Sequence, residues 1–104
     1  MGLIKARKVK VDGDRLSIST QFRNFPLEKS AIASFKVGRI SSLFDEIGIE
    51  VKCEKTFLVT ERVSGFFELA KFLCVEEAFG PLWYRDAEDG RQLEQICVGS
   101  GQFR

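Results

Sequence analysis

The chain has 104 residues, of which 44% are hydrophobic and 30% charged, a length and composition typical of one soluble globular domain. Sixteen basic and fifteen acidic residues leave a net charge of +1, so the basic excess of a nucleic-acid-binding domain is missing and no nucleic-acid partner is predicted. The sequence contains no histidine, which excludes Ser-His and Cys-His catalytic pairs and imidazole metal ligands.

The chain shows no sign of export or membrane insertion. Its apolar runs fall short of the roughly 18 residues that a membrane span needs, and the start, MGLIKARKVKVDG, lacks the apolar segment of a signal peptide. Three widely spaced cysteines, Cys53, Cys74 and Cys97, each lie in an apolar run. This spacing predicts small buried hydrophobic residues rather than a disulfide framework. A cytoplasmic location is therefore expected.

The first predicted element is a β-hairpin. Residues 5–11 and 15–20 both alternate apolar and polar side chains, the period-two pattern of strands with one buried face. Between them stands Asp12-Gly13-Asp14, and Asp-Gly is a strong turn signal because glycine accepts a positive φ. Pro26 then predicts a loop or an edge strand over residues 21–30, since proline cannot donate to a sheet ladder.

Further strands are predicted downstream. The segment 31–39 alternates again and is expected to end at Gly38. The segment 40–48 fits either one helical turn or a wide hairpin loop. Period-two alternation then returns in the segment 49–59, with a tight turn at Glu54-Lys55.

One long helix is predicted over residues 64–79, with Ser64 as its N-cap and Gly80-Pro81 as its end. After it come a turn at Asp89-Gly90, a short apolar run at Ile96–Val98, and a glycine-rich end, residues 99–104, that is expected to be frayed. Strands followed by a helix favour a single α+β domain over residues 1–104. Its expected architecture is a bent antiparallel β-sheet packed by one major C-terminal helix.

The predicted helix carries more apolar residues than one face can hold. At about 100° per residue, one broad arc faces the sheet and contains Phe66, Phe67, Leu69, Ala70, Leu73 and Cys74. A second cluster, Phe72, Val75 and Phe79, lies nearly opposite. Three explanations stay open: Leu82 and Trp83 fold back over this cluster, the cluster binds a partner or a second copy, or a ligand pocket lies between helix and sheet.

The segments SAIASFKVGR and TFLVTERVSGFFELAKFL resemble parts of small bacterial domains with a pleckstrin-homology-like fold. The resemblance covers residues 5–79, and it implies antiparallel strands in a bent sheet that a late helix closes at one end. Eukaryotic relatives of that fold often bind phosphoinositides near the first hairpin. Two carboxylates, Asp12 and Asp14, stand at that turn here, so lipid binding is not carried over.

No catalytic constellation is apparent. The carboxylates occur as sequence neighbours, Asp45-Glu46, Glu76-Glu77 and the group Asp86, Glu88 and Asp89, a pattern typical of solvated surface rather than of an acid–base pair in a cleft.

The sequence therefore predicts a non-enzymatic, cytoplasmic protein-interaction domain without metal or cofactor. A homodimer is compatible with this prediction. Trp83 and Tyr84 are residue types enriched in binding hot spots. The predicted partner-binding residues are Phe72, Val75, Phe79, Trp83 and Tyr84. The alternative is a domain that binds a small ligand or a lipid in a pocket between helix and sheet.

Overall fold

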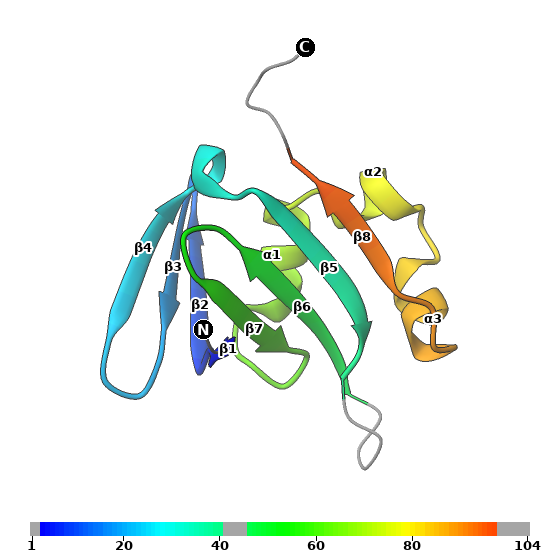
Figure 1. Cartoon of the computed structure of the whole chain (residues 1–104), viewed down its shortest axis with the longest axis horizontal. Coiled ribbons are helices and arrows are strands. Elements are labelled where there is room, and N and C mark those ends of the chain that lie inside the picture. The colour runs from blue at the N-terminus through cyan, green and yellow to red at the C-terminus, as the bar shows by residue number, and fades with distance from the viewer. Residues whose placement is uncertain (1–2, 41–45, 98–104) are drawn as a thin grey trace.

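The structure, a computed structural model, describes residues 3–40 and 46–97 of the chain. This part has an α+β fold with two sheets and three short helices (Figure 1). The elements in chain order are β1 (Leu3–Lys5), β2 (Lys8–Asp12), β3 (Arg15–Ser19), β4 (Asn24–Glu28), a 3-10 turn (Lys29–Ala31), β5 (Ser34–Arg39), β6 (Ile47–Lys52), β7 (Thr56–Thr60), α1 (Phe66–Phe72), α2 (Val75–Phe79), α3 (Trp83–Glu88) and β8 (Leu93–Ile96).

The smaller sheet has three antiparallel strands in the order β2-β3-β4. Its first hairpin confirms the predicted turn, because Asp12 pairs with Arg15 and Gly13 between them has a φ of 62°, a value that costs glycine little. Pro26 lies in β4, an edge strand, where its missing N–H costs no ladder hydrogen bond. One of the two predicted alternatives for residues 21–30 is thereby confirmed.

The larger sheet has five strands in the order β1-β7-β6-β5-β8. Four of them form antiparallel pairs, but β1 pairs with β7 in parallel, with Ile4 opposite Phe57. The expectation of one bent antiparallel sheet is therefore wrong: there are two sheets, and the larger is mixed. The chain leaves β1 at Ala6 and crosses into the smaller sheet, so the predicted strand 5–11 is divided between the two.

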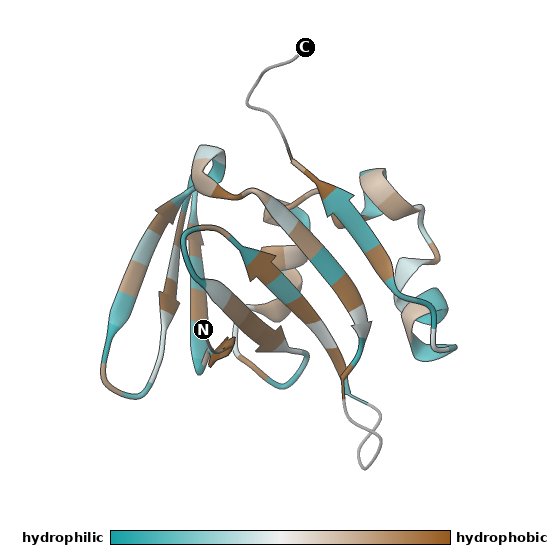
Figure 2. Ribbon diagram, in the orientation of Figure 1, coloured by the Kyte–Doolittle hydropathy of each residue, from teal (hydrophilic) through white to brown (hydrophobic). Residues whose placement is uncertain are grey.

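The faces of the larger sheet differ in chemistry, and alternating colours along β5 and β6 show this in Figure 2. The inner face carries Phe35, Val37, Ile49, Val51, Phe57 and Val59, all buried in the core. On the outer face Lys36 lies opposite both Glu50 and Glu94, an arrangement of opposite charges that favours the strand pairing. The core therefore lies between the larger sheet, the smaller sheet and the helices.

The prediction of one major helix over residues 64–79 is also wrong. The chain forms two helical segments there, α1 and α2, and Cys74 between them has the left-handed φ of 58°. An uninterrupted helix would bring Glu77 round toward the sheet at about 100° per residue. The break instead leaves Glu76 and Glu77 exposed and buries Val75 completely.

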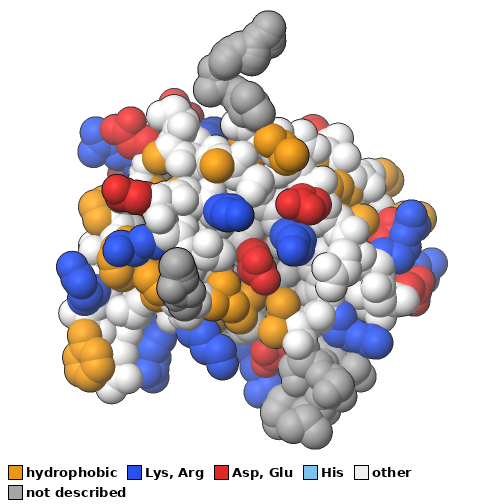
Figure 3. All heavy atoms as spheres, in the orientation of Figure 1, with side chains coloured by type: hydrophobic (Ala, Val, Ile, Leu, Met, Phe, Trp, Pro, Cys, Tyr) orange, Lys and Arg blue, Asp and Glu red, His pale blue; other side chains and the backbone are white. Residues whose placement is uncertain are grey.

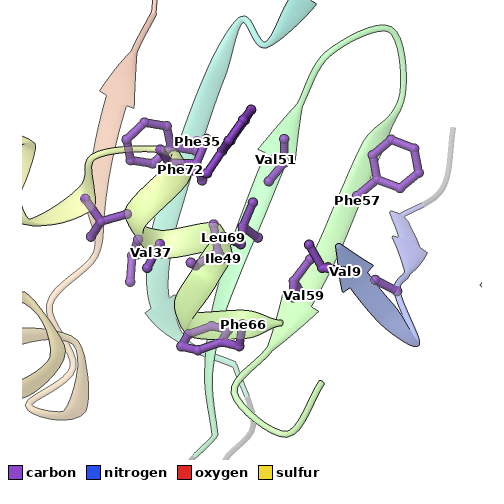
Figure 4. Packing of buried hydrophobic residues seen from close by; sticks show 14 of the residues in the cluster. Val9, Phe35, Val37, Ile49, Val51, Phe57, Val59, Phe66, Leu69 and Phe72 are labelled. Carbon is purple, nitrogen blue, oxygen red and sulfur yellow. The ribbon is translucent and has the colours of Figure 1, made fainter. Parts of the chain in front are cut away.

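The burial of the residues around α1 differs from the predicted helix faces. Phe66, Leu69 and Phe72 of α1 are buried in the core, with Leu69 beside Val37 and Ile49 of the sheet and Phe72 beside Phe35 (Figure 4). Phe67, predicted to face the sheet, is 54% exposed. Cys74, predicted to be a buried small residue, is exposed as well.

Two predicted features lie outside the described residues. The alternatives for residues 40–48 depend on 41–45, although Ile40 and Glu46 on either side are joined by a backbone hydrogen bond of 2.7 Å, and Ile47 and Gly48 belong to β6. The expected frayed end, residues 99–104, also falls outside the described part of the chain.

Candidate interaction surface

The predicted partner-binding residues divide into a buried group and a surface group. Phe72 is 8% exposed and Val75 is fully buried, so Val75 offers no surface to a partner and Phe72 offers little. Phe79 is half-buried, with its ring edge-on to Phe35 of β5 at 5.7 Å between centroids. Phe72 and Val75 are thus covered within the chain. Leu82, which together with Trp83 was predicted to fold back over the cluster, is itself 58% exposed.

Trp83 and Tyr84 do reach the surface, at the start of α3, where both are half-buried. Their rings are edge-on at 5.7 Å between centroids, and the Phe67 ring lies 6.1 Å from that of Tyr84. Leu82 comes directly before this pair. We call Phe67, Leu82, Trp83 and Tyr84 the aromatic face. Within α1 the buried residues are Phe66, Leu69, Ala70 and Phe72, so the buried arc is rotated away from Phe67 relative to the predicted one, and no sequence signal marks Phe67 as exposed.

A groove with a volume of about 470 Å³ opens beside the aromatic face. Phe67 and Trp83 belong to its lining, together with Ala70 of α1. The remaining lining residues bear opposite charges, Lys71 on one helix and Glu76 and Glu77 on the next. The groove thus offers apolar walls and a rim of both signs.

Tyr84 ties α3 to the segment that leads from β7 into α1. Its hydroxyl donates a hydrogen bond to the Glu61 carboxylate. This bond, together with burial and the negative charges of Glu61 and Glu88, raises the pKa of Tyr84 to about 12 from its ordinary value of 10.0, because ionisation would place a phenolate beside a carboxylate. The contact fixes one end of the aromatic face.

Because Tyr84 is the single tyrosine of the chain, tyrosinate absorbance in the near ultraviolet measures its pKa directly. We expect a midpoint near pH 12 in the wild type and a value closer to 10 in Glu61→Gln, which removes the neighbouring charge. The folded pKa lies above the unfolded one, so the stabilisation is complete below pH 10 and is lost as the pH rises toward 12. Equal midpoints in both proteins would contradict this pairing.

The remaining candidate groups occupy separate places. Glu46 forms an ion pair with Arg62 at 2.8 Å, and Asp86 with Arg91 at 3.6 Å, while Asp45 lies outside the described residues. No three His, Cys, Asp or Glu side chains within residues 3–40 and 46–97 are grouped so that they could hold a metal ion. Among the helices of those same residues, none has the length and apolar content to cross a bilayer.

The thiols are free and scattered. Lys29 Nζ donates to the exposed Cys74 Sγ at 3.8 Å. Cys97 is half-buried after β8, and burial raises the pKa of its thiol, which lowers its reactivity at neutral pH.

A second hollow, of about 430 Å³, lies where α1 meets the smaller sheet and is lined by residues that include Val11, Lys29 and Phe72. The space between α1 and the larger sheet is filled by core side chains, among them Phe66 and Leu69 (Figure 4). The groove beside the aromatic face thus lies between helices, and the second hollow lies between α1 and the smaller sheet. The predicted ligand pocket between helix and sheet stays a prediction.

Comparison of the chain with family models, with characterised proteins and with solved structures finds no match. The resemblance of residues 5–79 to pleckstrin-homology-like domains stays a prediction.

Proposed function

We propose that the chain is a non-enzymatic protein-interaction domain that pairs with a second copy of itself through the aromatic face. The observation that carries this proposal is Phe67, a large apolar side chain that is 54% exposed beside Trp83 and Tyr84 and along the groove. Aromatic side chains that converge on one surface patch are typical of interaction sites.

The charges around the groove favour a second copy as the partner. In a two-fold contact the same surface of both copies meets itself, so Lys71 of one copy can lie opposite Glu76 and Glu77 of the other. Opposite charges across an interface favour the correct pairing and speed association.

The expected affinity is weak. Fully burying a side chain such as Phe or Leu contributes about 1.5–3 kcal/mol, and Phe67 and Leu82 are already nearly half covered. Four such side chains in a dimer must also offset the lost translational and rotational freedom. We therefore expect dissociation in the micromolar range or weaker.

Sedimentation equilibrium over a wide range of protein concentration tests the proposal. We expect the wild type to form a dimer reversibly, and Phe67→Glu to stay monomeric because a charge in the contact remains unpaired. Ile96→Ser is the matched control, since Ile96 is 64% exposed on β8, outside the aromatic face, and it should dimerise like the wild type. A wild type that stays monomeric at every concentration would contradict the proposal.

A charge exchange tests the orientation of the two copies. Lys71→Glu should weaken the dimer, because three acidic residues then line each groove, and adding Glu77→Lys should restore it. Restoration is not expected if Lys71 and Glu77 do not face each other across the contact.

A further inference from the structure

The most exposed large apolar residue in the described part of the chain is remote from the aromatic face. Phe22 is 85% exposed in the turn between β3 and β4, at the lower left of Figure 1, whereas α3 lies on the right. A ring this exposed contributes little to packing within the chain. Single exposed apolar residues are common on protein surfaces, so the surroundings of Phe22 decide whether it has a partner.

The turn holds Phe22 in an ordered position. Thr20 N donates to the Arg23 carbonyl at 2.8 Å, and Arg23 N donates to Thr20 Oγ1 at 3.2 Å, so the two ends of the turn are closed against each other. Arg7 Nη1 also donates to Gln21 Oε1 at 3.4 Å. Between these fixed neighbours the ring projects into solvent.

Basic side chains gather at this end of the smaller sheet. Lys8 lies opposite Ser19, and Arg7 N donates to the Ser19 carbonyl at 2.7 Å, which places both residues next to the turn that contains Arg23. Within the described residues Arg7, Lys8 and Arg23 form no ion pair with a carboxylate. Figure 3 shows blue side chains around a protruding orange one at this corner.

The acidic residues of the same sheet lie at its other end. Asp12 and Asp14 flank the opposite turn, and Glu28 forms an ion pair with Arg15 there at 3.7 Å. Although the net charge of the chain is only +1, basic side chains gather at one end of the smaller sheet and acidic side chains at the other. Phe22 stands at the positive end.

We propose that this basic tip, Arg7, Lys8, Phe22 and Arg23, binds the surface of a bilayer that contains anionic lipids. The Phe22 ring enters the boundary between headgroups and acyl chains, and the three cations lie against the lipid phosphates. An apolar group that enters the interface and basic residues that are attracted to it are the two contributions that hold a peripheral protein on such a membrane. The tip lies apart from the aromatic face, so it can act in a monomer or a dimer.

The shape of the tip favours a membrane over a nucleic acid. Proteins that bind single strands stack successive bases on several aromatic side chains along a basic groove. Here Phe22 is the one strongly exposed ring beside these basic residues, because the nearby Phe25 is half-buried, with the Arg23 guanidinium 5.3 Å from its ring centroid. That geometry suits insertion into a soft interface.

Vesicle co-sedimentation at low ionic strength tests the proposal. We expect binding to vesicles of phosphatidylcholine and phosphatidylglycerol in equal parts, little binding to phosphatidylcholine alone, and release by salt. Phe22→Ser should lower the partition coefficient roughly five- to tenfold through lost apolar burial. Arg23→Gln and Lys8→Gln should each lower it about fivefold.

Two control variants match these changes in chemistry. Ile96→Ser removes another strongly exposed apolar side chain, on β8, and Arg15→Gln removes a cation from the opposite end of the same sheet. Both should bind the anionic vesicles like the wild type. All of the replaced side chains are exposed, so far-UV circular dichroism should show an unchanged fold.

The position of the ring in the bilayer can be measured separately. Trp83 is the single tryptophan of the chain, so Phe22→Trp combined with Trp83→Phe places the only indole at the tip. Lipids brominated on their acyl chains should quench this indole, and should leave Trp83 of the wild type unquenched.

Three results would overturn the proposal: no binding of the wild type to the anionic vesicles, equal binding by Phe22→Ser, or equal quenching of the two indoles. A parallel titration with a single-stranded oligonucleotide tests whether the basic tip binds nucleic acid instead of anionic lipid. Binding of the oligonucleotide that depends on Phe22, without binding to vesicles, would assign the tip to nucleic acid and overturn the membrane proposal.

Discussion

Replacing Gly65 with alanine is expected to lower the free energy of unfolding by about 3–5 kcal/mol, the sum of a left-handed backbone cost and steric overlap. Gly65 precedes α1 with a φ of 95°, and a Cβ built there would lie 2.0 Å from the Val9 carbonyl oxygen. Backbone cannot move aside as a flexible side chain can. The alanine would therefore push β2 and α1 apart and loosen the buried Val9 and Phe66.

Gly90→Ala is the matched control for this prediction. Gly90 has nearly the same φ, 94°, but a Cβ there would meet nothing within 4 Å. Its replacement should cost only the backbone term, about 1–2 kcal/mol. Urea denaturation followed by far-UV circular dichroism measures both values, and equal losses would show that β2 does not lie against Gly65. Since small domains have total stabilities of about 5–15 kcal/mol, the Gly65 variant should be the first to lose cooperative unfolding.

The strands were predictable because each carries its own local pattern. The hairpin at Gly13 was readable from one glycine in an Asp-Gly turn, and an edge strand was one of the two alternatives predicted from Pro26. The parallel pairing of β1 with β7 was not readable, since it joins Leu3–Lys5 to a strand more than fifty residues away. Three residues are too few to show a period, and nothing local specifies such a distant partner.

The helix break was beyond local sequence reasoning for a different physical reason. Left-handed backbone is usually assigned to glycine, whereas here Cys74 adopts it between two apolar segments. What favours the break is tertiary: it buries Val75 while Glu76 and Glu77 stay in water. Helix propensity and hydrophobic periodicity do not include the free energy gained by burying Val75. Both therefore predict one continuous helix through Cys74.

The limits of local sequence patterns also explain which surface residues were predicted correctly and which were not. Trp83 and Tyr84 were identified by residue type, and both lie on the aromatic face. Phe72 and Val75 were assigned to a partner, and Phe67 to the core, because periodicity alone placed the buried arc of the helix. In the structure that arc is rotated toward Phe72, and the helix breaks before Val75. Phe22 was not predictable as a binding residue, since a lone phenylalanine in a polar segment forms no pattern. Its proposed role rests on the closed turn and on the basic residues beside it.

Two neighbouring phenylalanines allow the position of α1 to be tested with one kind of substitution. Phe66 is 1% exposed and Phe67 is 54% exposed, although their rings touch edge-on at 4.9 Å between centroids. Phe66→Ala should lower the free energy of unfolding by about 3–5 kcal/mol, because it leaves a cavity under the helix. Phe67→Ala should lower it by no more than about 1 kcal/mol, since it removes only partly covered surface.

Urea denaturation of the two alanine variants at the same low protein concentration separates the two side chains. The concentration must be low because the proposed dimer would stabilise the wild type and Phe66→Ala but not Phe67→Ala. If both variants lost the same stability, Phe67 would belong to the core, as the helical periodicity of the sequence predicts. The aromatic face would then lack an exposed phenylalanine, and the observation that supports the proposed dimer would be lost.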